Sequence, residues 1–141
     1  MQRIIYSSQA TQDLSPDELV DLLRVARQHN EGADVSGMLL YCSQSFLQVL
    51  EGDKAVLRAT YARINGDARH TNLRLLMDAE VTTQLFPDWS MGFDHVEEDE
   101  IAASVEGYTP ATLYPLVNPD LITNGKVAET LLTLYAKNRA A

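Results

Sequence analysis

One short run, SFLQVLE at residues 45–51, limits the fold more than any other part of the sequence. Side chains of a β-strand point alternately to its two faces. Apolar side chains fill both sets of positions here: Phe46 and Leu50 on one face, Leu47 and Val49 on the other. Because such a strand has to be covered on both sides, the fold needs a layer of structure on each face of its sheet.

The rest of the chain is divided into short elements by Gly, Pro and Asn. Strands are expected at residues 3–8, 35–42, 45–51, 73–81 and 90–96, and helices at 15–30 and 53–65. The first helix begins with the capping box SPDE at residues 15–18 and is expected to end near His29 and Asn30, before Gly32. The order βαββαββ predicts an α+β, ferredoxin-like sheet with two helices on one face.

This topology places the first and third strands side by side at the centre of the sheet, so Tyr6 and Gln48 are candidate cross-strand neighbours. Both would be buried, and an unpaired buried amide or hydroxyl costs roughly 1–3 kcal/mol. The pattern alone favours the interpretation that the two groups satisfy each other. The alternative is that a polar ligand between the helices completes the network.

The tail begins with the acidic run 97–100 and continues through Pro110, Pro115 and Pro119. Near its end, an apolar stripe at helical spacing is expected to cover the sheet face that bears Leu47 and Val49. The stripe consists of Val127, Leu131, Leu134 and Tyr135. We therefore divide the chain into a sheet domain, residues 1–97, and a C-terminal helical extension, residues 98–141, that packs on the sheet.

Charge and cysteine content exclude several classes of function. Eleven Lys and Arg against 20 Asp and Glu give a net charge of −9, which argues against nucleic acid and anionic membranes as partners. Cys42 is the only cysteine, and the three histidines lack metal-ligand spacing, so no metal site is expected. The chain also lacks a G-x-G-x-x-G or P-loop motif, a nucleophile elbow and any long apolar run. A cytoplasmic location is the expectation.

Several polar side chains gather where the two predicted helices end. They are Asn30 on the first helix and Arg63, Asp67, Arg69 and His70 at or just beyond the end of the second. If the two ends converge on one side of the sheet, they can supply donors for a heteroaromatic ring and a phosphate. The simpler interpretation is a pair of solvated helix ends with Asn30 and Asn65 as caps, and the spacing alone favours it.

Five segments together resemble the BLUF family of blue-light sensors that use FAD. They are IIYSSQ, HNEGADVSGMLLY, SFLQVLEGD, TYARINGDARH and FPDWSM, in the expected order over about residues 3–93. The tail resembles that of short stand-alone members, whose C-terminal helices pack on the outer sheet face. Two departures are Ser36, where Thr is commoner, and Ala33-Asp34, where Asn-Gly is frequent. Neither touches a residue that the resemblance places at the ring.

The resemblance implies photochemistry at four positions, with FAD as the cofactor. Tyr6 would give an electron and a proton to the photoexcited flavin. Gln48 would rearrange its amide so that its hydrogen bond to the ring strengthens and the absorption shifts to the red. Trp89 and Met91 would exchange positions near Gln48 and pass the signal into the last strand.

The resemblance also implies which residues hold the cofactor. Asn30 would hold the edge of the ring, and Arg63 and Asp67 its other side and the ribityl chain. Arg69 and His70 would lie toward the ribityl phosphate, and Ser8 would be a further contact.

The expected function is therefore a photoreceptor and not an enzyme, which signals to a separate effector protein and forms a homo-oligomer. Two alternatives stay open. A small acylphosphatase-like hydrolase on the same sheet needs a phosphate-binding loop after the first strand, and SSQATQDLSP lacks the glycines and basic residues for one. A colourless interaction module with the same fold would use Tyr6 and Gln48 only as polar groups of its core.

Overall fold

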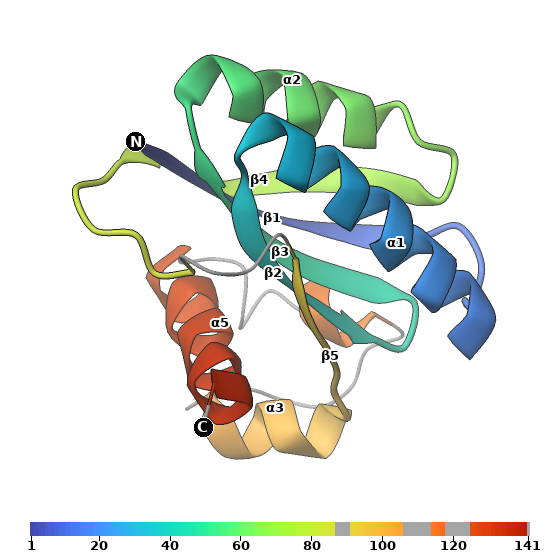
Figure 1. Cartoon of the computed structure of the whole chain (residues 1–141). Helices are drawn as coiled ribbons and strands as arrows, with labels where there is room; N and C mark the ends of the chain where they lie inside the picture. Colours follow the sequence, from blue (N-terminus) through green and yellow to red (C-terminus); the bar gives the residue numbers. More distant parts are fainter. Residues whose placement is uncertain (87–90, 106–113, 118–124, 141) are drawn as a thin grey trace.

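The computed structural model describes residues 1–86, 91–105, 114–117 and 125–140 (Figure 1). The elements are β1 (Gln2–Ala10), α1 (Pro16–Ala33), β2 (Ser36–Cys42), β3 (Ser45–Gly52), α2 (Lys54–Asn65), β4 (His70–Glu80), β5 (Gly92–His95), α3 (Glu98–Ser104), the 3-10 turn η1 (Pro115–Val117) and α5 (Gly125–Ala140). The strands form one sheet in the order β4-β1-β3-β2-β5, with β5 parallel to β2 and the other pairs antiparallel. This confirms the predicted α+β, ferredoxin-like topology.

Strand β3 is covered on both faces, as its sequence predicts. Helices α1 and α2 lie on one face of the sheet, and α3 and α5 lie on the other (Figure 1). Phe46 and Leu50 belong to the core beneath α1 and α2. Leu47 and Val49 belong to a second core, which α3, η1 and α5 complete with Ile101, Leu116, Leu131 and Leu132. The tail therefore covers the sheet face that bears Leu47 and Val49, as predicted.

The register of the central strands confirms the predicted neighbours. In the antiparallel pair of β1 and β3, Tyr6 lies opposite Gln48. Alternation along both strands points these two side chains to the face that α1 and α2 cover. The central pair thus sets the floor of the space between the two helices and the sheet.

Local sequence explains the beginning of α1 and the β2–β3 hairpin. The Ser15 side chain accepts a hydrogen bond from the Glu18 backbone N–H, and the Glu18 carboxylate accepts one from the Ser15 N–H, which completes the predicted capping box. The hairpin turns at Ser43 and Gln44, whose φ values are 43° and 61°. Two successive positive φ values are typical of a type I′ turn, here built without glycine.

The end of α1 differs from the prediction. The helix continues past His29 and Asn30 and includes Gly32. It stops at Asp34, which has φ 57° and whose backbone N–H bonds to the carbonyl oxygens of Asn30 and Glu31. An Asp tolerates the left-handed conformation, so it replaces the glycine that we expected to mark the helix end.

Two strands and the last helix also differ from the prediction. Strand β4 begins at His70, three residues early, because Thr71 and His70 pair with the end of β1. Strand β5 is shorter than residues 90–96. On α5, Leu134 is 41% exposed, so its assignment to the buried stripe is wrong, and Ala128 and Leu132 are buried in its place. In the described part of the chain, no helix is long and apolar enough to cross a membrane.

Candidate functional site

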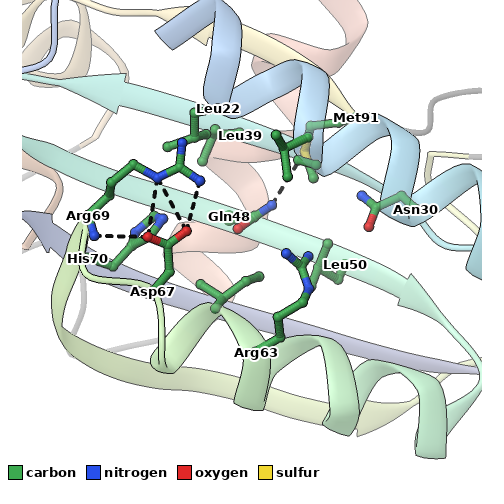
Figure 2. Close-up of a pocket in the computed structure, with 13 residues that line it drawn as sticks. Leu22, Asn30, Leu39, Gln48, Leu50, Arg63, Asp67, Arg69, His70 and Met91 are labelled. Atoms are coloured by element: carbon green, nitrogen blue, oxygen red, sulfur yellow. Dashed lines mark hydrogen bonds and ion pairs between the residues drawn. The ribbon is translucent and has the colours of Figure 1, made fainter. Parts of the chain in front are cut away.

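A pocket lies between α1, α2 and the sheet. Small-molecule sites commonly combine apolar walls with a few convergent polar groups, and this pocket has both. The walls here are apolar side chains of α1, α2 and the sheet, such as Leu22, Leu39, Leu50 and Ile64. Asp67, Arg69 and His70 group at one end of the pocket and Asn30 lies at the other, with Gln48 and Arg63 between them (Figure 2).

The structure brings most of the sequence-predicted site residues together. Those that line the pocket are Asn30, Gln48, Arg63, Asp67, Arg69, His70 and Met91. Tyr6 and Ser8 lie behind this lining, and Trp89 falls outside the described residues. The sequence analysis missed the α1 side of the wall. This side includes Leu22 and Ala26, and their spacing of four residues, typical of one face of a helix, was the signal available in the sequence.

Gln48 meets Met91 at the floor of the pocket. The side chains of both residues are buried, and Gln48 Nε2 donates a hydrogen bond to Met91 Sδ over 3.4 Å (Figure 2). A thioether is a weak acceptor, so this contact holds the amide loosely.

Tyr6 is fully buried, and its hydroxyl has no hydrogen-bond partner in the part of the chain that the structure describes. The interpretation that Tyr6 and Gln48 satisfy each other is therefore wrong. The Tyr6 ring makes an edge-to-face contact with Tyr61, with ring centroids 5.3 Å apart and planes at 81°. Burial, with a smaller contribution from Tyr61, raises the pKa of Tyr6 well above its ordinary value. Tyr6 is thus a protonated phenol throughout the physiological pH range.

Asp67 and Arg69 form a paired unit at one end of the pocket. Arg69 Nη2 donates to Asp67 Oδ2 at 2.9 Å, and the Arg69 backbone N–H donates to Asp67 Oδ1, also at 2.9 Å (Figure 2). These bonds from Arg69 lower the pKa of Asp67, which stays ionised. Within the described residues, the Arg63 side chain makes no hydrogen bond or ion pair, so its guanidinium remains available to a ligand.

His70 is held in place by Ser8 and Phe46, whereas the sequence analysis placed Ser8 at the cofactor. Its Nδ1 lies 3.1 Å from the hydroxyl oxygen of Ser8, and its ring packs on Phe46 with centroids 4.7 Å apart. Ser8 therefore contacts the pocket only through His70. Burial lowers the pKa of His70 to about 4, so the imidazole is neutral at pH 7.

The arrangement suits a planar heteroaromatic ligand with carbonyl and N–H groups along its edge. An amide, an unpaired guanidinium and a buried phenol are donors that such an edge can engage. Among the described residues, no cluster of three His, Cys, Asp or Glu side chains could hold a metal ion.

Over most of the chain, comparison with known proteins finds the family that the sequence resembles. Residues 1–92 match the family model of BLUF, described as sensors of blue light using FAD. Photoactivated adenylate cyclase subunit beta of Euglena longa is 33% identical over 99 residues, which cover 69% of this chain and 12% of the relative. Subunit alpha of Euglena gracilis is 32% identical over 99 residues, which cover 69% of this chain and 10% of the relative. The chain thus spans only a small part of these curated relatives.

Solved structures agree with the fold. A structure of BlsA in its ground state is 29% identical, with a TM-score of 0.78, and the match covers 94% of this chain and 87% of that one. A bacterial light-regulated adenylyl cyclase is 31% identical, with a TM-score of 0.63, and the match covers 68% of this chain and 28% of that one.

Proposed function

The chain belongs to the BLUF family of blue-light sensors that use FAD, and we propose that it binds FAD in the pocket between α1 and α2 and responds to light through Tyr6 and Gln48. Membership confirms the resemblance found in the sequence. The family is described as sensors of blue light using FAD, which supports the proposal that this chain acts as a sensor and not as an enzyme. It provides the photochemistry and leaves the output reaction to another protein.

The observation that carries the proposal is the unpaired hydroxyl of Tyr6. Leaving a buried hydroxyl without a partner costs roughly 1–3 kcal/mol, and folded proteins rarely keep such a group without a reason. Tyr6 lies across from Gln48, whose amide N–H bonds to a weak sulfur acceptor. A flavin ring carries the acceptors that this pair of residues lacks. The residues present therefore fit the cofactor.

Different polar groups of the pocket bind different parts of the cofactor. Asn30 and Arg63 hold the edge of the ring with an amide and an unpaired guanidinium. Asp67 is oriented by Arg69 and accepts hydrogen bonds from the other side of the ring or the ribityl chain. Arg69 and His70 lie at the end of the pocket toward which we place the ribityl phosphate, and Ser8 fixes the His70 ring.

The protein's own residues need little chemistry beyond that of a phenol and an amide. When bound, the flavin supplies blue-light absorption and, once excited, an acceptor strong enough to oxidise a phenol. Tyr6 keeps its proton in the dark because burial disfavours the phenolate, so it releases an electron and a proton together from its hydroxyl group. No catalytic base is required.

After this transfer, the Gln48 amide rearranges, and its hydrogen bonding to the ring changes. The amide has a donor end and an acceptor end, and reversing them by rotation or tautomerism changes what the ring receives. The Nε2 group then gives up its weak hydrogen bond to Met91 Sδ, which costs little free energy. The stronger hydrogen bond that Gln48 makes to the ring after this change gives the red-shifted signalling state.

Met91 passes the change onward, because it directly precedes β5. We place Trp89 as its exchange partner and the tail, residues 98–141, as the element that carries the signal to a separate effector protein. In this proposal the protein signals as a homo-oligomer. Relatives that carry a similar region are subunits of photoactivated adenylate cyclases, which shows that such a region can work with an effector.

The test is the visible absorption spectrum of the purified protein before and after blue light, with the cofactor identified by mass after release. We expect a flavin spectrum that shifts to the red and returns in the dark, with FAD as the released compound. A protein that stays colourless after incubation with FAD would contradict the proposal and favour the interaction module. Turnover of an acyl phosphate by that colourless protein would favour the hydrolase.

A further inference from the structure

The sheet face opposite the pocket carries a buried charge pair. Glu51 on β3 is fully buried, and Arg3, opposite it on β1, is only 7% exposed. Arg3 Nε donates to Glu51 Oε2 at 2.8 Å, and Arg3 Nη2 lies 2.7 Å from the same oxygen. The sequence analysis did not single out either residue.

The same carboxylate holds the backbone that leads toward Met91. Glu51 Oε1 accepts hydrogen bonds from the Leu85 N–H at 3.0 Å and from the Phe86 N–H at 2.9 Å. Phe86 is buried in the core on the tail side and precedes Met91 by five residues. Glu51 therefore fixes the backbone at Leu85 and Phe86.

Arg3 extends the network to the C-terminal helix. Its Nη1 donates to Glu129 Oε2 on α5 at 3.1 Å, and its Nη2 donates to the Thr83 carbonyl oxygen at 2.7 Å. One buried pair thus joins two central strands, the segment before Phe86 and α5. Glu51 lies three residues from Gln48 on β3, and alternation places the two side chains on opposite faces of that strand.

Stability alone does not explain such a network. A buried ion pair is often no more stabilising than apolar side chains of the same volume, although losing one partner is costly. The layer between the sheet and α5 is mainly an apolar core, and hydrophobic attraction is non-directional. Charged hydrogen bonds have directional geometry, so they define one position of α5 relative to β3 where apolar packing allows several.

We propose that Glu51 is a positioning residue that fixes the backbone at Leu85 and Phe86 and, through Arg3 and Glu129, helix α5 relative to Gln48. A rearrangement at Gln48, three residues from Glu51 on β3, then reaches α5 through this network. This inference rests on the proposed function, because it requires Gln48 to rearrange in light.

Glu129→Gln tests the link to α5, since the Glu129 side chain is 20% exposed and lies far from the pocket lining. The experiment compares hydrogen–deuterium exchange of α5 in the full flavin-loaded chain, in the dark and in blue light. We expect a normal red shift, dark exchange of α5 amides about tenfold faster because a charged hydrogen bond is lost, and no light-induced change there. Lys126→Gln is the control, because it removes the exposed contact of Lys126 with Glu129 Oε1 and leaves the bond from Arg3 to Glu129 Oε2 in place.

A normal red shift together with a wild-type light response of α5 in Glu129→Gln overturns the coupling and leaves the proposed function standing. A wild-type protein that shows no red shift overturns the proposed function and the coupling with it. The two failures are therefore distinguishable.

Glu51→Gln tests the positioning itself. We expect the Leu85 and Phe86 amides to exchange about tenfold faster in the dark and the methyl NMR signal of Met91 to move. The double variant Arg3→Met, Glu51→Gln separates positioning from stability, because it removes the buried charge that Glu51→Gln leaves unpaired. If the double variant regains stability and also the light response of α5, the network is only structural and the proposal is wrong. If Glu51→Gln does not fold, the Glu129→Gln result decides.

Discussion

Tyr6 lies directly opposite Gln48 in the antiparallel pair of β1 and β3, yet the Tyr6 hydroxyl has no partner among the described residues. Two polar side chains at the centre of a sheet would ordinarily bond to each other. Because these two groups do not satisfy each other, the pair supports the proposal that a ligand completes the network.

Tyr6→Phe removes the unpaired hydroxyl, and we expect it to stabilise the flavin-free protein by about 1 kcal/mol. The loaded variant should bind flavin and show no red shift, because phenylalanine cannot give up a proton and an electron. The matched control is Tyr41→Phe. The Tyr41 hydroxyl donates to Asp13 at 2.7 Å and accepts from the Leu14 N–H, so its loss should destabilise the protein by about 1 kcal/mol. Urea unfolding and light-minus-dark spectra measure both effects, and a normal photocycle in Tyr6→Phe would remove this residue from the mechanism.

Gln48→Leu replaces the side chain by a shorter, apolar one and deletes the amide. Flavin should still bind, because Asn30 and Arg63 remain in the pocket, whereas the red-shifted state should be absent. Absorption spectra before and after blue light measure this directly. A full red shift in this variant would show that no rearrangement of the amide is needed.

His70 makes the stability of the flavin-free protein depend on pH. Its pKa is lowered to about 4 by burial, so the unfolded chain binds more protons than the folded one between about pH 4 and 6.5. The free energy of unfolding therefore falls as the pH drops through this range, by about 2 kcal/mol between pH 7 and pH 5. Burial also lowers the pKa of His29, which acts in the same direction.

Urea unfolding of His70→Gln at pH 7 and pH 5 isolates the contribution of His70. The loss of stability on acidification should be smaller than in the wild type by about 2 kcal/mol, and the part due to His29 should remain. An unchanged slope in His70→Gln would mean that His70 titrates at its ordinary pKa in the folded protein.

Two glycines should respond to alanine in opposite ways. A Cβ added at Gly37 would lie 2.2 Å from the Val49 carbonyl oxygen, so Gly37→Ala should distort the β2–β3 pair and cost about 1–3 kcal/mol. A Cβ at Gly32 meets nothing within 4 Å, and this residue lies inside α1. Gly32→Ala should therefore stabilise the protein by roughly 0.5–1 kcal/mol. Thermal unfolding checks both, and a destabilised Gly32→Ala would show that α1 is not continuous at this position.

Local patterns were enough to predict the elements and their order. The capping box at Ser15, the alternation in residues 45–51 and the two-residue turn at Ser43 and Gln44 all act within a few residues. The pairing of β1 with β3 followed from topology, because few connections of this order are possible in one sheet. The ends of elements were less accurate, since the end of α1 at Asp34 and the start of β4 at His70 depend on backbone geometry and strand pairing.

The sequence by itself determined the fold class, the residues of the central strands and the family, because periodicity, capping and motif order are properties of neighbouring residues. Only the tertiary structure decided which polar groups are satisfied. It left Tyr6 unpaired, placed Ser8 behind His70 and joined Arg3 to Glu51 and Glu129 across 48 and 126 positions of sequence. The physical reason is that a hydrogen bond or ion pair depends on distances of about 3 Å between atoms brought together by packing, and no local pattern encodes those distances.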